Sequence, residues 1–214
     1  MRGMLVTVEG VEGAGKSTQC RRLAAWLVER GLDVVETREP DGTPTGVAVR
    51  GLFAAGPPPT PLAQVLLFAA ARQQHVTDVI RPALARGAVV LSDRYADATV
   101  AYQGYGQGVG LETIRDLNAL ATGGVLPDLT LLLDLDPLVG MSRVVARSRR
   151  LDAFEQMDLA FHRRVREGYL EIARAEKRRV AVLSADQPED ALAAAIRSAV
   201  EERLLGRGGP GGGD

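Results

Sequence analysis

The 214-residue chain is poor in aromatic residues, has a single cysteine and carries almost no excess of charge. Aromatic residues make up 4% of it, and Cys20 alone excludes an intrachain disulfide or a cysteine-rich zinc site. The 26 Lys and Arg residues face 27 Asp and Glu residues, which gives a formal net charge of -1. Because no global positive field is available to hold a nucleic acid, any recognition of phosphate must come from a local site.

Long apolar runs and metal-ligand spacings are also missing. No apolar run reaches the roughly 20 residues that a membrane-spanning helix needs, and Met1-Arg2-Gly3 leads into a β-branched segment instead of a signal peptide. His75 and His162 lie far apart, without metal-ligand spacing. We therefore expect a cytoplasmic enzyme with no membrane or nucleic-acid partner.

Short apolar runs that alternate with helical patterns predict an α/β fold. The runs are Leu5–Val8, Asp33–Thr37, Ala88–Leu91, Leu129–Leu135 and Val180–Leu183. The third and fourth runs lack polar alternation, as is typical of strands covered on both faces of a parallel sheet. We expect a doubly wound, five-stranded parallel sheet flanked by helices, with ligands at the carboxyl ends of the strands.

The length and the helical patterns indicate one domain. Apolar residues at helical spacing predict three helices, over residues 16–30, 61–86 and 188–205. A single domain over residues 1–206, with a short mobile lid at about 142–156, accounts for this pattern. The tail 207–214 is nearly all glycine and is expected to be disordered.

A glycine-rich segment follows the first predicted strand and matches the pattern G-x-x-x-x-G-K-[ST]. Its glycines let backbone N–H groups turn inward around an anion, and a helix beginning near Lys16 points its positive dipole end at the same place. Lys16 would reach the β- and γ-phosphates of a nucleotide, and the Ser17 hydroxyl would bind Mg²⁺. A glycine turn without a ligand is the alternative, but the complete motif between strand and helix favours ATP binding. The predicted loop residues are Gly10, Val11, Glu12, Gly13, Ala14, Gly15, Lys16, Ser17 and Thr18.

Asp93 and Arg94 follow a buried strand that is expected beside the first one. The carboxylate can orient a metal's water or an acceptor, so Ser17 and Asp93 form the predicted metal site, while the guanidinium can bind a phosphate bidentately. A structural ion pair is the alternative. Tyr95, Thr99 and Tyr102 follow at i, i+4 and i+7, a spacing that predicts one shared helix face.

Two further groups of residues favour a kinase. Phe68 and Arg72 lie at i, i+4, where an aromatic ring could stack on a planar base while the guanidinium reads a carbonyl; a core role is the alternative for Phe68. The segment 143–150 contains four arginines and no acid. It could be a solvated helix face, yet arginines on a closing lid would neutralise the charge of a transferred phosphate and exclude water.

Together these residues resemble the thymidylate kinase family, in its bacterial type with a basic lid. The resemblance spans residues 4 to about 205, and its segments are residues 9–18, 37–40, 67–72, 93–95, 101–104, 151–152 and 154–156. It implies a P-loop kinase fold, transfer of the γ-phosphate of ATP to dTMP with Mg²⁺, and a homodimer.

The resemblance also implies roles on the acceptor side. Arg94 would hold the 5′-phosphate, helped by Arg38 or Arg50, while Phe68 stacks on thymine and Arg72 donates to its carbonyl. Other residues would meet the N3 edge of the base, the sugar and its 3′-hydroxyl. The full predicted set is Glu12, Arg38, Glu39, Arg50, Phe68, Arg72, Arg94, Thr99, Tyr102 and Gln103.

On the ATP side, the resemblance adds Arg143, Ala185 and Asp186 to the phosphate loop. Because Gly13 stands where some family members have an arginine, the catalytic arginines are expected on the lid. The predicted catalytic residues are Lys16, Asp93, Arg94, Arg147, Arg149 and Arg150.

Three positions depart from the family pattern. Asp41 replaces a glycine, Gln107 replaces an arginine, and Ala153 replaces a lid arginine. Which of Arg147, Arg149 and Arg150 takes over the missing lid charge is left open. Another nucleoside monophosphate kinase or a deoxynucleoside kinase is the near alternative for the function, and a nucleotide-dependent switch is the distant one.

Overall fold

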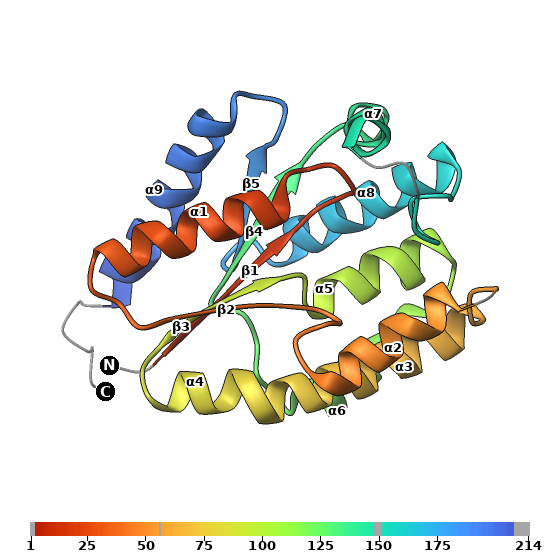
Figure 1. Cartoon of the computed structure of the whole chain (residues 1–214), viewed down its shortest axis with the longest axis horizontal. Coiled ribbons are helices and arrows are strands. Elements are labelled where there is room, and N and C mark those ends of the chain that lie inside the picture. Colours follow the sequence, from red (N-terminus) through yellow and green to blue (C-terminus); the bar gives the residue numbers. More distant parts are fainter. Residues whose placement is uncertain (1–2, 56, 148–150, 208–214) are drawn as a thin grey trace.

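A computed structural model describes residues 3–55, 57–147 and 151–207 (Figure 1). Five strands form its sheet: β1 (Met4–Glu9), β2 (Val34–Arg38), β3 (Val89–Asp93), β4 (Leu129–Asp134) and β5 (Val180–Ser184). Their order is β2-β3-β1-β4-β5, and every neighbouring pair is parallel. The predicted doubly wound parallel sheet is confirmed; four predicted strands lie within one residue of their observed bounds, and the third, predicted to end at Leu91, runs two residues further to Asp93.

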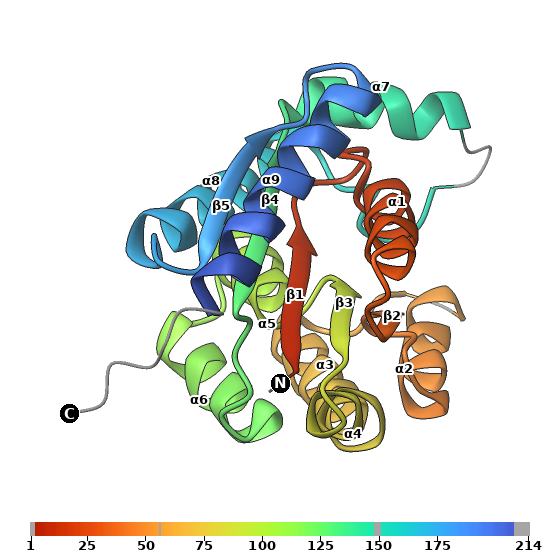
Figure 2. The same ribbon diagram turned by 90° about the vertical axis from the view of Figure 1, so that its left-hand side faces the viewer.

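Helices cover both faces of this sheet. On one face α1 (Lys16–Glu29) packs against α9 (Glu189–Arg207), and on the other α8 (Leu159–Ala175) packs against the π-helical segment η2 (Val100–Gly106) (Figures 1 and 2). The side chains of β1 alternate between these faces, as the twofold period of a strand requires. Val6 therefore belongs to the cluster under α1, whereas Leu5 belongs to a second cluster.

The long predicted helix over residues 61–86 is divided into three parts. They are α3 (Pro61–His75), the π-helical turn η1 (Val76–Ile80) and α4 (Arg81–Ala85). A π-turn contains an extra residue, so it rotates every later side chain relative to an unbroken α-helix. A similar change follows α5 (Ala96–Thr99), where η2 begins.

Tyr95, Thr99 and Tyr102 do not share one helix face as expected, because Tyr95 precedes the helix, although all three line the same cavity. Tyr95 lies outside α5 and its ring packs in the cluster of Leu5, whereas Tyr102 packs with residues of α8. Thr99 ends α5, immediately before the π-helical segment shifts the helical phase.

Four helices were not recognised as such in the sequence. They are α2 (Pro44–Ala54), α6 (Leu111–Thr122), α7 (Pro137–Arg147) and α8. Local signals existed for two of them: the Thr43 hydroxyl accepts from the Gly46 N–H at 3.1 Å before Pro44, and Asp158 caps α8 by accepting from the Phe161 N–H at 2.7 Å. The last helix runs to Arg207, two residues past its predicted end, and the tail 208–214 lies outside the described residues.

Among the described residues, no helix is long and apolar enough to span a bilayer. The helices instead bury one side against the sheet, and the largest buried side chains come from both layers. This packing holds the carboxyl ends of β1, β3 and β4 at one edge of the molecule, where the phosphate loop begins.

Two glycines of α2 allow a test of how closely this helix packs against the segment at Pro40. A Cβ atom at the buried Gly46 would overlap the Pro40 carbonyl oxygen, whereas one at the exposed Gly51 would meet nothing within 4 Å. We expect Gly46→Ala to lower the free energy of unfolding by about 3 kcal/mol, because the backbone must shift. Gly51→Ala should raise it by about 0.5–1 kcal/mol, since alanine favours a helix.

Urea denaturation of both variants measures this difference. Each variant adds the same methyl group to the same helix, so helix propensity alone predicts a gain for both. Equal stabilisation of the two variants would contradict the close contact between α2 and the segment at Pro40.

Candidate active site

The loop between β1 and α1 has the backbone that an anion cradle requires. Gly10, Gly13 and Gly15 have φ values of 142°, 74° and 88°, a region that favours glycine. Gly15 precedes α1, whose first turn carries no acidic side chain to compete with an anion. The loop can therefore present backbone N–H groups and the positive end of a helix dipole to a phosphate.

Lys16 is buried at the start of α1, 7% exposed, with its ammonium folded towards the loop. Its Nζ donates to the carbonyl oxygens of Gly10 at 3.0 Å and Val11 at 2.9 Å. Burial, followed by the charge of Arg94, lowers the pKa of Lys16, and nearby carboxylates oppose this shift. The side chain is thus held beside the expected phosphate position by bonds that a ligand can replace.

Ser17 and Asp93 meet at the carboxyl ends of the central strands. Val8 of β1 pairs with Asp93 of β3, and the Ser17 hydroxyl donates to Asp93 Oδ2 at 2.5 Å. A hydroxyl and a carboxylate are the oxygen ligands that Mg²⁺ accepts when nucleotide phosphates and water complete its coordination. Within the described residues, no group of three or more His, Cys, Asp or Glu side chains could hold a metal alone, so the oxygen pair fits a shared magnesium site.

Glu12, Arg94 and Tyr102 form a partly buried network next to the loop. Arg94 Nη2 donates to Glu12 Oε1 at 2.6 Å, and the Tyr102 hydroxyl donates to the same oxygen at 2.8 Å. Burial alone would raise the pKa of Glu12, but the charges of Arg94 and Lys16 and these hydrogen bonds lower it to about 2. Glu12 is therefore a carboxylate at neutral pH, and Arg94 remains charged opposite it.

All ten residues predicted to bind the acceptor line one cavity of about 1050 Å³. The same cavity is lined by loop and metal-site residues, including Gly13, Lys16, Ser17 and Asp93, and by Arg147 of the lid. Its walls come from segments between residues 12 and 157, so the chain folds these distant positions into one place.

Arg72 lies at the back of this cavity, 2% exposed and bound by neighbours on several elements. Its Nε donates to Glu39 Oε2 at 2.9 Å and Nη1 to Asn118 Oδ1 at 2.7 Å. Nη2 donates to Thr99 Oγ1 at 3.0 Å and the Tyr95 carbonyl oxygen at 3.1 Å. These contacts hold the guanidinium plane fixed and leave one Nη1 hydrogen without a partner among the described residues.

Glu39 lines the cavity, but its carboxylate contacts two other side chains, those of Arg72 and His75. Besides pairing with Arg72, it lies 3.2 Å from Nδ1 of His75, whose Nε2 is 2.7 Å from Thr37 Oγ1. The geometry gives Glu39 the task of orienting Arg72. Sequence reasoning did not find His75 or Asn118 in this network, because neither belongs to a local motif.

An aromatic cluster closes the same end of the cavity. Phe68 stacks on Phe53 with ring centroids 5.0 Å apart at 10°, and Phe154 of the lid lies 6.4 Å from Phe68. Phe154 also packs edge-on against Tyr102 at 5.6 Å. Phe53 was not predicted as a site residue, because it lies on α2, a helix that the sequence did not reveal.

The lid begins with α7, which carries two of the predicted arginines. Arg147 Nη2 donates to Glu155 Oε1 at 3.2 Å at the cavity edge. Arg143 Nη1 donates to the Ala185 carbonyl oxygen at 3.2 Å, and its Nη2 lies 3.8 Å from Asp186 Oδ1, which brings the three added ATP-side residues together. Two further predicted catalytic residues, Arg149 and Arg150, lie outside the described residues.

The phosphate loop and α7 approach each other so closely at Gly13 and Gly140 that neither position has room for a side chain. A Cβ atom at Gly13 would overlap the Gly140 carbonyl oxygen, and one at Gly140 would overlap the carbonyl oxygen of Glu12. An arginine therefore cannot occupy position 13 unless α7 moves. This close approach leaves no room for an arginine at position 13, and Arg143 and Arg147 lie on α7 instead.

Two departures from the family pattern have defined surroundings. Asp41 forms an ion pair with Nε of Arg50, which leaves both terminal nitrogens of that arginine for other contacts. Gln107 replaces an arginine next to Gly106, whose carbonyl oxygen accepts two hydrogen bonds from Arg164 of α8 at 3.1 and 3.0 Å. A positive charge is thus supplied near position 107 by another helix.

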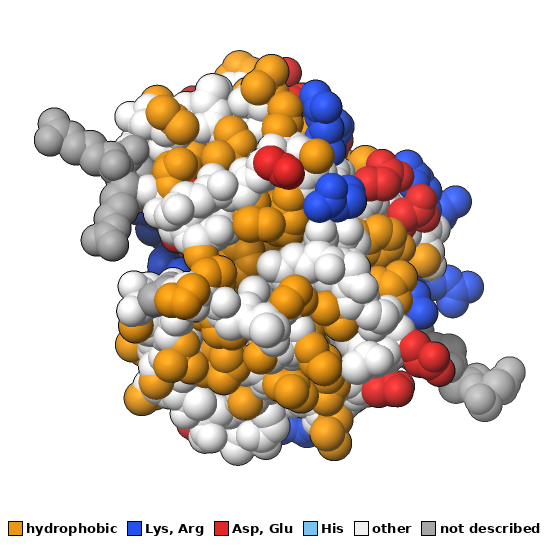
Figure 3. Space-filling view, turned by 90° about the vertical axis from the view of Figure 1, so that its right-hand side faces the viewer, with side chains coloured by type: hydrophobic (Ala, Val, Ile, Leu, Met, Phe, Trp, Pro, Cys, Tyr) orange, Lys and Arg blue, Asp and Glu red, His pale blue; other side chains and the backbone are white. Residues whose placement is uncertain are grey.

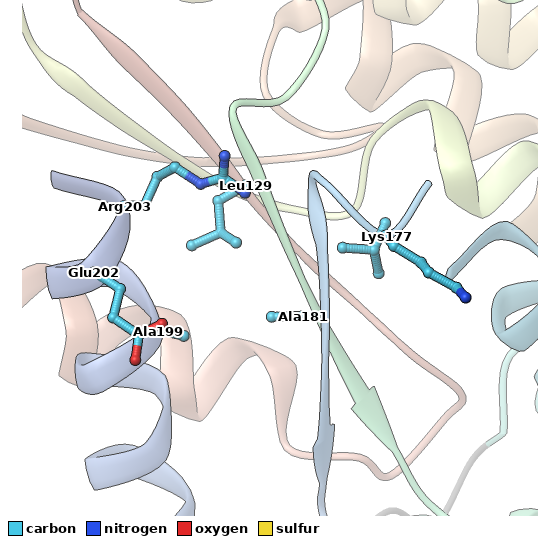
Figure 4. A pocket seen from close by; sticks show the side chains of 7 residues that line it. Leu129, Lys177, Ala181, Ala199, Glu202 and Arg203 are labelled. Carbon is cyan, nitrogen blue, oxygen red and sulfur yellow. The ribbon is translucent and has the colours of Figure 1, made fainter. Parts of the chain in front are cut away.

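A second cavity, of about 410 Å³, lies between α9 and the strands β4 and β5 (Figure 4). It includes Leu129 and Val180, the first residues of these parallel strands, so it is at the opposite edge of the sheet from the phosphate loop. None of the predicted site residues lines it. Its lining residues are Leu129, Lys177, Val180, Ala181, Ala199, Glu202 and Arg203.

Comparisons with known proteins agree with this geometry. Residues 8–196 match the family model described as "Thymidylate kinase". The chain is 51% identical to the thymidylate kinase of Deinococcus radiodurans, across 94% of this chain and 98% of that one, and 53% identical to that of Pseudomonas putida, across 90% and 94%. A crystal structure of thymidylate kinase from Ehrlichia chaffeensis is similar with a TM-score of 0.78 and 31% identity, covering 94% of this chain and 100% of that one.

The Arg72 network predicts a large difference between two neighbouring cavity residues. Arg72→Ala would leave the Glu39 carboxylate buried without its charge partner, so we expect a loss of about 3–5 kcal/mol in the free energy of unfolding. Phe68→Leu keeps most of the apolar volume of a partly exposed side chain and should cost less than about 1.5 kcal/mol. Urea denaturation measures both, and similar losses would contradict the structural role of Arg72.

Proposed function

We propose that this chain, which belongs to the thymidylate kinase family, transfers the γ-phosphate of ATP to dTMP in the 1050 Å³ cavity beside its phosphate loop. The observation that carries the proposal is the shared cavity, which all ten predicted acceptor residues line together with the loop. A nucleotide-dependent switch would not need an acceptor chamber joined to its triphosphate site.

The apolar end of the cavity suits a pyrimidine base. The ring of Phe68 offers a stacking surface, and Arg72, held by four protein groups, can donate its remaining Nη1 hydrogen to a thymine carbonyl. Thr99 and Gln103 line the same wall and would meet the N3 edge of the base. Because Arg72 is already oriented, binding costs little side-chain entropy.

The sugar and phosphate would lie towards the loop. Tyr102 would pack under the deoxyribose, and Glu12, a carboxylate at neutral pH, would accept from the 3′-hydroxyl. Arg94 would hold the 5′-phosphate, with Arg38 and Arg50 at the cavity wall. A bare nucleoside would bring no phosphate to the donors of these three guanidinium groups that the protein leaves over, which favours a monophosphate acceptor over a nucleoside.

Phosphoryl transfer then requires positioning and neutralisation of charge. An oxygen of the dTMP phosphate attacks the γ-phosphorus of ATP, the bond to the β-phosphate oxygen breaks, and ADP leaves. Loop N–H groups and Lys16 would hold the phosphates, and Arg147 would neutralise the equatorial oxygens from the lid. Ser17 and Asp93 would hold Mg²⁺, which would supply positive charge to the β- and γ-phosphates when bound with ATP.

The chain also offers a surface for a homodimer. Leu62 and Leu66 of α3 are 49% and 51% exposed, and α3 packs against both α2 and α6. Val47 and Leu52 of α2 and Leu120 of α6 add exposed apolar area beside them. Figure 3 shows hydrophobic side chains gathered over the lower half of the molecule, the part in which α2, α3 and α6 lie in Figure 1. An exposed apolar patch of this kind is typical of a protein interface.

A coupled assay of ADP release with dTMP, dUMP, dCMP, dGMP, AMP and thymidine tests the acceptor. We expect the highest kcat/KM with dTMP and little turnover of thymidine, because the arginines need a phosphate. A preference for a purine monophosphate would overturn the assignment of the base site, and a preference for thymidine would overturn that of the phosphate site.

Arg94→Ala tests the phosphate contact itself. Loss of a charge-assisted hydrogen bond costs about 1.5–3 kcal/mol, so the KM for dTMP should rise at least about tenfold. The control Arg174→Ala removes an arginine that pairs with Glu167 and Glu171 on the exposed side of α8 and should leave KM unchanged. An unchanged KM in Arg94→Ala would remove Arg94 from this role.

Sedimentation equilibrium tests the homodimer. We expect the wild-type chain to have twice the chain mass and Leu66→Glu to sediment as a monomer, because a buried unpaired charge is costly at an apolar interface. Val28→Glu on α1, at 57% exposure, is the control outside the patch and should stay dimeric. Dissociation of both variants, or of neither, would argue against this surface.

A further inference from the structure

Arg94 has an unusual backbone. It is the one non-glycine residue with positive φ, at 74°, among the residues that the structure describes. An L-residue in this left-handed region pays roughly 1–2 kcal/mol, so the surrounding structure must hold it there. Arg94 follows β3 directly, so its backbone conformation sets the direction in which the guanidinium leaves the sheet.

Hydrogen bonds fix the backbone on both sides of this residue. The Arg94 N–H donates to the Val8 carbonyl oxygen at 3.1 Å, and the Ser92 hydroxyl donates to the Arg94 carbonyl oxygen at 2.7 Å. The next amide, that of Tyr95, has a side-chain partner: it donates to Oε1 of Glu9 at 2.7 Å. A carboxyl group at the end of β1 thus holds the peptide that follows the strained residue.

The same carboxyl group reaches a third element. Glu9 is fully buried, and its Oε2 accepts from the hydroxyl of Tyr169 on α8 at 2.8 Å. Glu9 therefore links β1, the segment after β3 and α8, although it does not line the acceptor cavity. None of the roles described above uses it.

We propose that Glu9 is a positioning residue for the acceptor: by holding the Tyr95 amide and the Tyr169 hydroxyl, it keeps Arg94 directed at the acceptor phosphate. This inference rests on the proposed role of Arg94. Arg94 reaches Glu12 and lies with its Cζ 4.9 Å from the centroid of the Tyr102 ring, so a small rotation of its backbone would break both contacts. Such a displacement can cost up to about a hundredfold in rate.

The protonation of Glu9 gives this role a measurable signature. Burial, followed by the charge of Asp97, raises the pKa of Glu9 to about 8, although Arg94 and the two hydrogen bonds oppose the shift. The charged and titratable groups that interact electrostatically with Glu9 come from several elements. They are Arg94, Asp97 of α5, Lys16 of α1, Tyr169 of α8 and Arg179 before β5. At pH 7 Glu9 is neutral, and above pH 8 it becomes an anion near Arg94 that repels an incoming phosphate.

Glu9→Ala removes both hydrogen bonds and should raise the KM for dTMP about tenfold or more while leaving the KM for ATP nearly unchanged. Glu9→Gln keeps the shape, since its amide oxygen can accept from Tyr95 and its NH₂ can donate to Tyr169. Its KM at pH 7 should stay close to the wild-type value. Between pH 7 and 9 the wild-type KM for dTMP should rise, and that of Glu9→Gln should rise less.

Thr7→Val is the matched control. Thr7 is fully buried on the same strand, and its hydroxyl lies 2.8 Å from that of Thr130, so the variant loses one buried hydrogen bond in which neither Glu9 nor Arg94 takes part. It should lower the melting temperature without a selective change in the KM for dTMP. Equal changes in the two KM values of Glu9→Ala would show a merely structural role and overturn the proposal.

Arg94→Ala, assayed in parallel, distinguishes failure of the proposed role of Arg94 from failure of the proposed role of Glu9. If it leaves the KM for dTMP unchanged, the proposed role of Arg94 fails, and the inference fails with it. If it raises this KM while Glu9→Ala does not, only the inference is overturned. Should Glu9→Ala fail to fold, the pH profile of Glu9→Gln decides, and a profile identical to that of the wild type would contradict the proposal.

Discussion

The parallel pairing of β1 with both β3 and β4 is the constraint on which the rest of the site depends. The sheet order reverses beside β1, because the chain builds β2 and β3 on one side of it and β4 and β5 on the other. A crevice opens at the carboxyl ends of the strands at such a switch point. The pairing of Val8 with Asp93 then puts the phosphate loop next to the segment that carries Arg94.

Buried charge makes this site ready for its ligands. Removing a single charge from water costs several kcal/mol unless a partner compensates it, so Glu12 pairs with Arg94 and Glu39 pairs with Arg72. All four residues line the acceptor cavity, and each ion pair holds its two side chains in a fixed direction. An acceptor that enters this cavity meets donors that are already oriented, which reduces the reorganisation needed before phosphoryl transfer.

The contact between the phosphate loop and α7 has a chemical consequence. Because Gly13 and Gly140 approach so closely that neither tolerates a Cβ atom, the loop itself cannot supply an arginine. Arg143 and Arg147 lie on α7 instead, and Arg147 donates to Glu155.

Features that depend on short spacings could be predicted from the sequence. The glycines of the loop, the β-branched runs and the acceptor-side motifs indicated the sheet, the family and ten residues that share one cavity. Helices α2, α6, α7 and α8 were not recognised, although Thr43 offered a cap for α2 and Asp158 offered one for α8. With α2 unrecognised, Phe53 was missed as the stacking partner of Phe68.

The sequence alone determined which residues bend the backbone around an anion and which segments become buried strands, because both properties follow from neighbouring residues. The tertiary structure decided which distant groups meet. Tyr169 lies 160 positions from Glu9, and Asn118 lies 46 positions from Arg72. Such pairs depend on the order of the strands and on which helices pack against one another, so the orientation of Arg72 and Arg94 is a property of the folded molecule.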